Sequence, residues 1–312
     1  MNKLIKNAFT LIELLVVIAI IGILSGMIVV GMSGVTQKAT IAKAQVFSNS
    51  LRNSLLLNLV SEWKFDELTT AINGTVIQDS WNGMTGTLVT DNTTTEKLSS
   101  DCVSGKCITL DGTGDYINAG SNLSIGLNSF TFSFWIKTSV SGTRQTIINR
   151  VASTTGWIGT FDLPYSSTAN GLFSITSTSY PGGINIHRYV SPTNNNSNTT
   201  DGKWHYFVLT CDRSQAKLPD IYLDGTLANG SGNGDCNVLV DDIPSGVLYI
   251  GSNGGTSRYF NGSIDDFRFF NIAMPTSQIR EQYYLGLNKL LTNRGITEEE
   301  YLSRLNNYAS NN

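Results

Sequence analysis

The sequence predicts an α+β protein in which a long N-terminal helix precedes an antiparallel β-sandwich and a short helical tail. Residues 14–37 carry no charge and are mostly apolar, which is typical of a helix in an apolar environment. Beyond residue 61, Gly, Ser, Thr and Asn separate short apolar runs, which is typical of strands joined by turns. We therefore expect a helix over residues 9–60, a sandwich over 61–285 and a helical extension over 286–312.

The apolar N-terminal run is long enough to cross a bilayer as a helix. Lys3 and Lys6 precede it, and basic residues at such positions stay on the cytoplasmic side. A secretory signal has a shorter apolar region that ends at a small-residue cleavage site. A plain membrane anchor fits the length but leaves Glu13 unexplained, because an isolated carboxylate in hydrocarbon costs about 2.5–3.5 kcal/mol or more.

The order Ala8, Phe9 and Glu13, followed by the apolar run, resembles the N-terminus of type IV pilins and type II secretion pseudopilins. The resemblance implies that a prepilin peptidase removes residues 1–8 and methylates the new amine of Phe9. Glu13 then pairs with the Phe9 ammonium of a neighbouring subunit, and a buried pair of this kind specifies register more than it adds stability. The chain departs from the family in having Ala8 where Gly is usual and no Pro before Pro164.

The helix is predicted to continue through residues 37–60, which contain neither Pro nor Gly and carry apolar residues at roughly helical spacing. At 1.5 Å per residue, a helix from Phe9 to Val60 is on the order of 80 Å long. Four glycines between residues 22 and 34 mark the expected place for it to bend, because each costs about 1 kcal/mol in a helix.

Several segments beyond residue 61 alternate apolar and polar residues in the manner of strands. Residues 130–136, 204–209 and 220–223 are examples, and Asp224-Gly225 has the composition of a two-residue hairpin turn. Many short strands with regular turns predict an antiparallel sandwich. The large aromatic residues expected in its core are Trp63, Phe65, Trp135, Trp204 and Phe267.

Six short motifs narrow the sandwich to a family. They are residues 59–67 (LVSEWKFDE), 79–83 (DSWNG), 110–117 (LDGTGDYI), 201–205 (DGKWH), 221–225 (IYLDG) and 260–270 (FNGSIDDFRFF). Together they resemble the laminin-G-like, concanavalin-A-like jelly-roll domain of bacterial surface proteins, over about residues 60–285. The resemblance implies a jelly roll, but this fold hosts binders, adhesins and a few enzymes.

Catalysis is not expected of this domain. Glycoside hydrolases need two carboxylates placed across a sugar bond, yet Glu96 is the only Glu between Glu67 and Glu281. His187 and His205 lie far apart in the sequence and form no evident triad. His205 is therefore expected to make a structural hydrogen bond.

By resemblance to the same family, a structural Ca²⁺ is expected at Asp79 and Asn82, with Asp265 or Asp266 completing the site. Ca²⁺ takes 6–8 oxygen ligands, often from Asp, Asn and carbonyl groups in loops. The turn at residues 79–83 has fewer polar oxygens than the family's usual Asp-Ser-Ser-Gly-Asn. The alternative is that these side chains only stabilise a turn and a strand. No other cofactor is required.

Four cysteines fit export to an oxidising compartment. They allow three pairings, of which Cys102–Cys107 with Cys211–Cys236 is favoured because each pair closes a local loop beside predicted strands. Free buried thiols are the alternative.

Residues 276–291 are predicted to form a helix after the last strand. A second helix is predicted to begin near Thr297, because Thr297 and Glu300 form a capping box. Its expected apolar face consists of Tyr301, Leu302 and Leu305, and it packs either on its own domain or on a neighbouring subunit.

A net charge of −3, with no basic cluster beyond the leader, argues against nucleic acid as a partner. The sequence favours a type IV pilus-like filament subunit, which the pilus machinery assembles from a single-pass inner-membrane precursor into a helical homopolymer on the bacterial surface. Its lectin-like domain is expected to project outward and to bind glycans or host surfaces. The alternatives are a minor pilin or secretion pseudopilin and a membrane-anchored carbohydrate-binding protein.

Overall fold

The computed structural model divides into two units, Met1–Leu56 and Leu57–Asn312. It describes residues 11, 12, 14–22, 55–91, 97–121, 123, 128–151, 157–163, 171–177, 184–190, 199–228, 230–238 and 246–310. In the first unit, Leu11, Ile12 and residues 14–22 are helical and expose apolar side chains. Within the described ranges, no helix is both long and apolar enough to cross a membrane.

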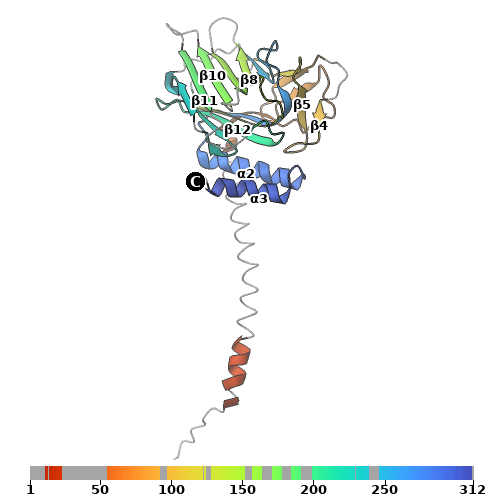
Figure 1. The fold of residues 1–312 in the computed structure, drawn as a ribbon. Helices are drawn as coiled ribbons and strands as arrows, with labels where there is room; N and C mark the ends of the chain where they lie inside the picture. Colours follow the sequence, from red (N-terminus) through yellow and green to blue (C-terminus); the bar gives the residue numbers. More distant parts are fainter. Residues whose placement is uncertain are drawn as a thin grey trace, which may run out of the picture. The chain divides into compact units, whose positions relative to one another are not determined.

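The second unit is an antiparallel β-sandwich of the jelly-roll type, as predicted (Figure 1). The first sheet has the order β14-β13-β12-β7-β17-β5-β4, with β1 also paired to β17. Its strands are β1 (Leu59–Trp63), β4 (Leu98–Ser99), β5 (Cys107–Asp111), β7 (Phe130–Lys137), β12 (Trp204–Cys211), β13 (Asp220–Leu223), β14 (Thr226–Leu227) and β17 (Asn261–Phe270).

The second sheet has the order β15-β11-β10-β9-β8-β16-β6-β3-β2. Its strands are β2 (Val76–Gln78), β3 (Thr85–Val89), β6 (Tyr116–Asn118), β8 (Gln145–Val151), β9 (Trp157–Leu163), β10 (Gly171–Ser177), β11 (Ile184–Val190), β15 (Gly230–Asn233) and β16 (Val247–Ile250). A 3₁₀ helix, η2 (Cys236–Val238), and two α-helices, α2 (Thr276–Thr292) and α3 (Glu298–Ser310), complete the unit.

The core between the sheets is rich in aromatic side chains from alternate positions of the central strands. Phe130, Phe132 and Phe134 of β7 all face it, and the Phe132 ring lies 4.7 Å from that of Phe269. Each fully buried side chain of this size contributes about 1.5–3 kcal/mol of hydrophobic stabilisation. The apolar and polar residues of β7 therefore alternate because every second side chain faces this core.

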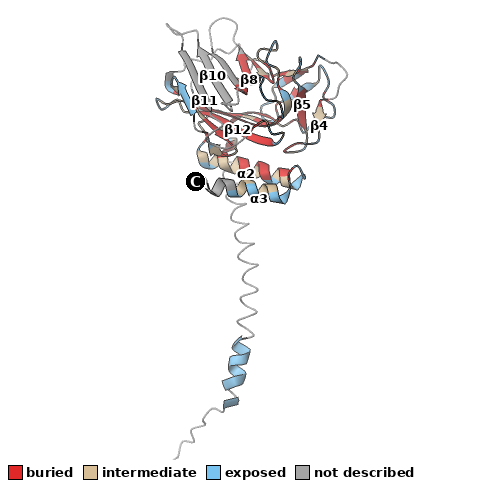
Figure 2. Ribbon diagram, viewed as in Figure 1, coloured by how far each residue is buried: buried red, intermediate tan, exposed pale blue. Residues whose placement is uncertain are grey.

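The opposite face of the first sheet is also buried, because α2 packs on it (Figure 2). Trp135 of β7, Tyr206 of β12 and Tyr283 of α2 form a second aromatic layer, with the Trp135 and Tyr283 rings 5.8 Å apart. α3 packs on α2, and Arg304 reaches the sheet by donating to the Trp204 carbonyl over 2.7 Å. The tail therefore packs on its own domain through these contacts. Leu302, predicted on the apolar face of α3, is instead exposed.

Two predicted boundaries differ from the structure. Leu59 and Val60 begin β1 instead of ending a helix, because this stretch pairs with β17, where Leu59 lies opposite Phe270. The predicted end of the sandwich at residue 285 falls inside α2, whose later residues Leu287 and Leu290 are buried. The remainder of the predicted helix over 9–60 lies mostly outside the described residues.

Local sequence signals elsewhere are confirmed. Asp224-Gly225 turns β13 into β14, with Leu223 opposite Thr226. The Thr297 hydroxyl accepts the Glu300 N–H over 3.1 Å, which is one half of the predicted capping box, while the Glu300 carboxylate pairs with Arg304 over 2.8 Å. All five aromatic residues expected in the core are buried, but only Trp63, Phe65 and Phe267 belong to the cluster between the sheets. Trp135 packs under α2, and Trp204 also lies outside that cluster.

Candidate functional site

A row of polar and aromatic side chains crosses the outer face of the second sheet. Thr87 lies opposite Asn118, Asn118 opposite Tyr249, and Tyr249 opposite Asn149, on strands β3, β6, β16 and β8. Residues paired in this way share a face of the sheet. Their chain neighbours Leu88, Ile117 and Ile250 point into the core, so the row points outward.

A tyrosine cluster stands beside this row. The Tyr116 ring lies 5.8 Å from that of Tyr249 and 6.3 Å from that of Tyr259, and the latter pair is stacked. Burial first, and then Tyr249 and Tyr259, raise the pKa of Tyr116. A tyrosine phenol is already protonated at neutral pH at its ordinary pKa, so the raised pKa keeps the Tyr116 hydroxyl protonated.

The loop between β16 and β17 positions Tyr259. The Tyr259 hydroxyl donates to the Gly255 carbonyl over 3.0 Å. Gly255 has a φ of +70° and lies so close to Tyr116 that a Cβ would be 2.9 Å from its Cζ. Only glycine adopts this conformation without strain and leaves room for the ring.

Buried Asp162 anchors the same loop to the sheet. Its Oδ1 accepts from the Thr146 hydroxyl over 2.5 Å, and its Oδ2 accepts from Arg144 Nε over 2.7 Å. Arg258, immediately before Tyr259, pairs with Asp162 over 3.5 Å and accepts the Thr146 N–H through its carbonyl over 2.8 Å. These contacts fix the backbone immediately before Tyr259.

We define the row and the cluster together as the tyrosine–amide face: Thr87, Tyr116, Asn118, Asn149, Tyr249 and Tyr259. Thr87 is exposed, Asn149 is buried, and the others are half-buried. Aromatic rings bind apolar ligand surfaces, while amides and hydroxyls both donate and accept hydrogen bonds. This set suits a neutral ligand rich in hydroxyl groups.

The predicted calcium ligands Asp79 and Asn82 serve a turn. Oδ1 of buried Asp79 accepts the N–H groups of Glu62 and Trp81 over 3.0 and 2.8 Å. Asn82 donates to the Val60 carbonyl over 2.6 Å and accepts the Met84 N–H over 2.9 Å. Within the described residues, Asp79 Oδ2 is buried and lacks a hydrogen-bond partner.

Asp265 and Asp266 lie at a bulge in β17, and both carboxylates already have hydrogen-bond or ion-pair partners. Asp265 Oδ2 accepts the N–H groups of Val103 and Ser104 over 2.9 and 3.0 Å. Burial first, and then the charge of Asp266, raise the pKa of Asp265 well above its ordinary value.

Asp266 is held by two cations. It pairs with Arg268 over 3.0 Å and with Lys289 of α2 over 3.2 Å. Burial alone would raise the pKa of Asp266, but Arg268 and Lys289 outweigh it and hold the value below the ordinary one. Two cations already neutralise this carboxylate, so it does not fit a calcium site.

The three predicted carboxylate ligands, Asp79, Asp265 and Asp266, do not gather into one cluster among the described residues. Among the described residues, Asp79 and Asp266 belong to no cluster of three His, Cys, Asp or Glu side chains, and Asp265 clusters only with Cys102 and Cys107. A second cluster, Asp91, Asp111 and Asp115, already contains an ammonium. Lys97 Nζ lies 2.7 Å from Asp111 Oδ2 and 2.5 Å from Asp115 Oδ2.

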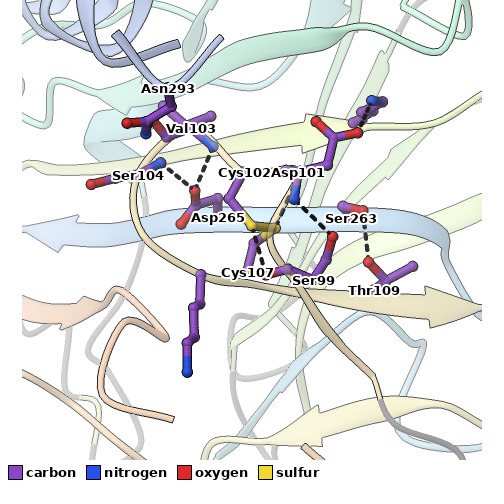
Figure 3. Close-up of a disulfide and its surroundings, with 12 residues drawn as sticks. Ser99, Asp101, Cys102, Val103, Ser104, Cys107, Thr109, Ser263, Asp265 and Asn293 are labelled. Carbon is purple, nitrogen blue, oxygen red and sulfur yellow. Dashed lines mark hydrogen bonds and ion pairs between the residues drawn. A yellow bond between two sulfur atoms is a disulfide. The ribbon is translucent and has the colours of Figure 1, made fainter. Parts of the chain in front are cut away.

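Both favoured disulfides are present, Cys102–Cys107 and Cys211–Cys236. The first closes a tight loop whose backbone binds Asp265 on one side and Asn293 at the end of α2 on the other (Figure 3). The second joins β12 to η2. The first loop therefore contacts both β17 and the end of α2, and the second disulfide links η2 to β12 of the first sheet.

His205 makes the expected structural contacts. Nδ1 lies 2.8 Å from Asp224 Oδ2 and Nε2 lies 3.1 Å from Asp201 Oδ1. Burial alone would lower the pKa of His205, but Asp224 and Asp201 raise it to about 9. The protonated His205 side chain, held between the two carboxylates, therefore links the turn at Asp201 to the hairpin at Asp224.

Ala8, Phe9 and Glu13 lie outside the described residues. The tyrosine–amide face was not predicted from the sequence. Tyr116 stands in a family motif, but the others have no local signal. Strand pairing alone brings Asn118, Tyr249 and Asn149 together.

Comparison with protein families matches residues 111–280, more than half of the 312-residue chain, to the concanavalin A-like lectin/glucanases superfamily. The chain belongs to this superfamily. Residues 5–29 match the prokaryotic N-terminal methylation motif, so this lectin-superfamily member also carries the predicted pilin-type N-terminus. No curated protein matches the chain in sequence.

Solved structures share the superfamily fold at low identity. Domain 4 of AbnA, an extracellular arabinanase of Geobacillus stearothermophilus solved with arabinotriose, is 19% identical with a TM-score of 0.51, covering 72% of this chain and 97% of that domain. The binding domain of botulinum neurotoxin serotype D is 16% identical with a TM-score of 0.51, covering 76% of this chain and 53% of that domain.

The binding domain of Paraclostridial Mosquitocidal Protein 1 is 16% identical with a TM-score of 0.52, covering 75% of this chain and 53% of that domain. This superfamily member thus spans about half the length of the two toxin binding domains. At these identities the likeness establishes the fold alone.

Proposed function

We propose that this protein is a subunit of a type IV pilus-like surface filament whose lectin-fold domain binds glycans. The observation that carries the proposal is the presence, on one chain, of an N-terminal methylation motif and a concanavalin A-like domain. The motif supplies a route to the surface, and the domain supplies a ligand-binding scaffold.

Assembly proceeds through the N-terminus. The prepilin peptidase cuts the inner-membrane precursor between Ala8 and Phe9 and methylates Phe9. Glu13 pairs with the Phe9 ammonium of the adjacent copy, which fixes the register of a helical homopolymer. An apolar helix supplies the adhesion between copies, and its carboxylate supplies the specificity.

The ligand binds the tyrosine–amide face. Tyr116 and Tyr249 present rings to the apolar faces of sugar residues, while Asn118 and Thr87 bind hydroxyl groups. The arabinanase domain of the same fold was solved with an oligosaccharide, which supports a glycan as the ligand class. No catalytic step and no calcium ion are part of the proposal.

Immunogold electron microscopy of surface-sheared material tests the assembly half. Antibody against the sandwich should label fibres along their whole length. Label confined to fibre tips would favour a minor pilin or pseudopilin. Label confined to membranes, with no fibres, would favour a membrane-anchored carbohydrate-binding protein.

A further inference from the structure

One lysine of the sandwich is buried against two carboxyl groups. The side chain of Lys97 is 4% exposed and that of Asp115 is 0% exposed, whereas the Asp111 side chain is 45% exposed. Lys97 Nζ lies 2.5 Å from Asp115 Oδ2 and 2.7 Å from Asp111 Oδ2. The amine nitrogen is therefore in direct contact with a carboxyl group that is closed to bulk solvent.

Main-chain hydrogen bonds hold the two groups together. The Lys97 N–H donates to the Ala71 carbonyl over 2.7 Å, and the Lys97 carbonyl accepts the Thr109 N–H over 2.8 Å. Asp111 ends β5, and its N–H donates to Asp115 Oδ2 over 3.0 Å. Groups oriented in this way within one molecule react as if each were present at about 10⁵–10⁸ M.

As an ion pair, the arrangement compensates its buried charges incompletely. Among the described residues, Asp115 Oδ1 is buried and accepts no hydrogen bond. A buried ion pair repays the cost of desolvation only when further hydrogen bonds satisfy its remaining lone pairs. A covalent bond between Lys97 Nζ and the carboxyl carbon of Asp115 removes both charges and releases the unpartnered oxygen as water.

The two carboxyl groups are tuned in opposite directions. Burial first, and then the charge of Asp111, raise the pKa of Asp115. Burial alone would raise the pKa of Asp111, but hydrogen bonds from Lys97 and Thr113 lower it to about 2. Burial alone would lower the pKa of Lys97, but the two carboxylates raise it. Asp115 is therefore the carboxyl group that takes up the lysine's proton, while Asp111 stays charged.

We propose that Lys97 and Asp115 condense spontaneously into an intramolecular isopeptide bond, with Asp111 as the proton relay. One ammonium proton of Lys97 passes to the Asp115 carboxylate, which leaves a neutral amine beside a neutral acid. The Nζ lone pair then forms a bond to Asp115 Cγ, and the π electrons of the carbonyl group move onto Oδ2. This oxygen accepts the Asp111 N–H, which stabilises the developing negative charge.

Release of water completes the condensation. A second proton leaves Lys97 Nζ, passes through Asp111 Oδ2 and reaches the hydroxyl group at Asp115 Oδ1. The Cγ–Oδ1 bond breaks, its electron pair leaves with the oxygen as water, and the Cγ–Oδ2 double bond forms again. The third proton stays on the amide nitrogen. An ammonium and a carboxylate therefore give one neutral amide and one water, and no oxidant or cofactor enters the balance.

The bond joins the two sheets of the sandwich. Lys97 precedes β4 of the first sheet, and Asp115 precedes β6 of the second. A covalent link of this kind restricts the unfolded chain as a disulfide does, but reducing agents do not break it. The link depends neither on filament assembly nor on glycan binding.

Peptide mapping of the full chain, purified in detergent, tests the inference. After reduction, trypsin should leave residues 65–106 joined to residues 107–137, because it does not cut after an acylated Lys97. The joined pair should weigh one water less than the sum of the two peptides, and fragmentation should place the link at Lys97 and Asp115. Separate peptides, with cleavage after Lys97, would overturn the inference. An Asp-Gly pair that loses water to form a cyclic imide joins no peptides and is thereby distinguished.

Substitutions identify the reacting groups. Lys97→Arg keeps the positive charge but removes the nucleophilic amine, so the joined peptides should disappear. Lys217→Arg, at a partly exposed lysine that pairs with Asp220 over 3.0 Å, is the matched control and should retain them. Asp111→Asn removes the relay and should reduce the linked fraction at least tenfold; an unchanged fraction would overturn the role given to Asp111.

The outcomes separate this inference from the proposed function. A chain that carries the link but forms no fibres supports the isopeptide bond and contradicts the filament. Fibres built from unlinked chains have the opposite meaning. Because the unsubstituted chain carries the deciding measurement, the test stays decisive even if Lys97→Arg fails to fold.

Discussion

Gly286 of α2 lies directly against the indole of Trp135 on β7, so that a Cβ at residue 286 would overlap the ring. The contact lets the helix approach the sheet closely enough for Tyr283 to stack on Trp135. The last helices of the chain are therefore part of the sandwich's own second core.

Gly286→Ala should destabilise the sandwich by about 1–3 kcal/mol, because an overpacked core forces side chains or backbone to shift. Helix propensity alone would predict the opposite, since Ala favours a helix over Gly by about 1 kcal/mol. Thermal unfolding measures the difference. Ser303→Ala, at an exposed position of α3, is the control and should leave Tm nearly unchanged; a raised Tm for Gly286→Ala would contradict the packing account.

Stability should fall as pH rises through the range from about 6.5 to 9. The pKa of His205 is raised to about 9 in the folded protein from its ordinary value of 6.5. The stabilisation is therefore complete below pH 6.5 and is lost as pH rises through 9, with a size on the order of 3 kcal/mol. Urea unfolding across this range measures it, and His205→Gln should flatten the slope. An equal slope in both proteins would refute the assignment.

Tyr249→Ala should weaken binding to an immobilised glycan array at least tenfold, which corresponds to about 1.4 kcal/mol. The loss follows from removing the ring at the centre of the tyrosine–amide face. Tyr301→Ala is the matched control, because Tyr301 is a half-buried tyrosine on α3. Both variants are assayed as full-length protein in detergent. Unchanged glycan binding by Tyr249→Ala would place the ligand elsewhere.

Chelation should leave Tm unchanged. Asp266 is neutralised by Arg268 and Lys289, and the other predicted ligands already accept or donate backbone hydrogen bonds. Differential scanning calorimetry with and without EDTA measures this. A drop in Tm that Ca²⁺ but not Mg²⁺ restores would reveal a site that uses the buried Asp79 Oδ2.

The sequence anticipates features that a few adjacent residues determine. Asp224-Gly225 defines its hairpin because both residues adopt positive φ angles, 51° and 77°. β7 and β12 follow from local alternation. In contrast, Leu59 and Val60 fit a helical pattern but become strand, because pairing with Phe270 across the chain outweighs local propensity.

The tyrosine–amide face could not be predicted from local sequence patterns. Asn118, Tyr249 and Asn149 come from three strands widely separated in the chain, and only their register aligns them. Asp266 resembles a calcium ligand in the sequence. No local pattern indicates that Lys289, on the later helix α2, neutralises it.

The N-terminus of subunits recovered from sheared surface fibres tests the central claim most directly. Mass spectrometry should find a chain that begins at N-methylated Phe9. In cells that express Glu13→Val, the same processed chain should remain in the membrane without fibres, because the register-fixing carboxylate is gone. Fibres that lack this chain, or a surface protein that retains residues 1–8, would contradict the account.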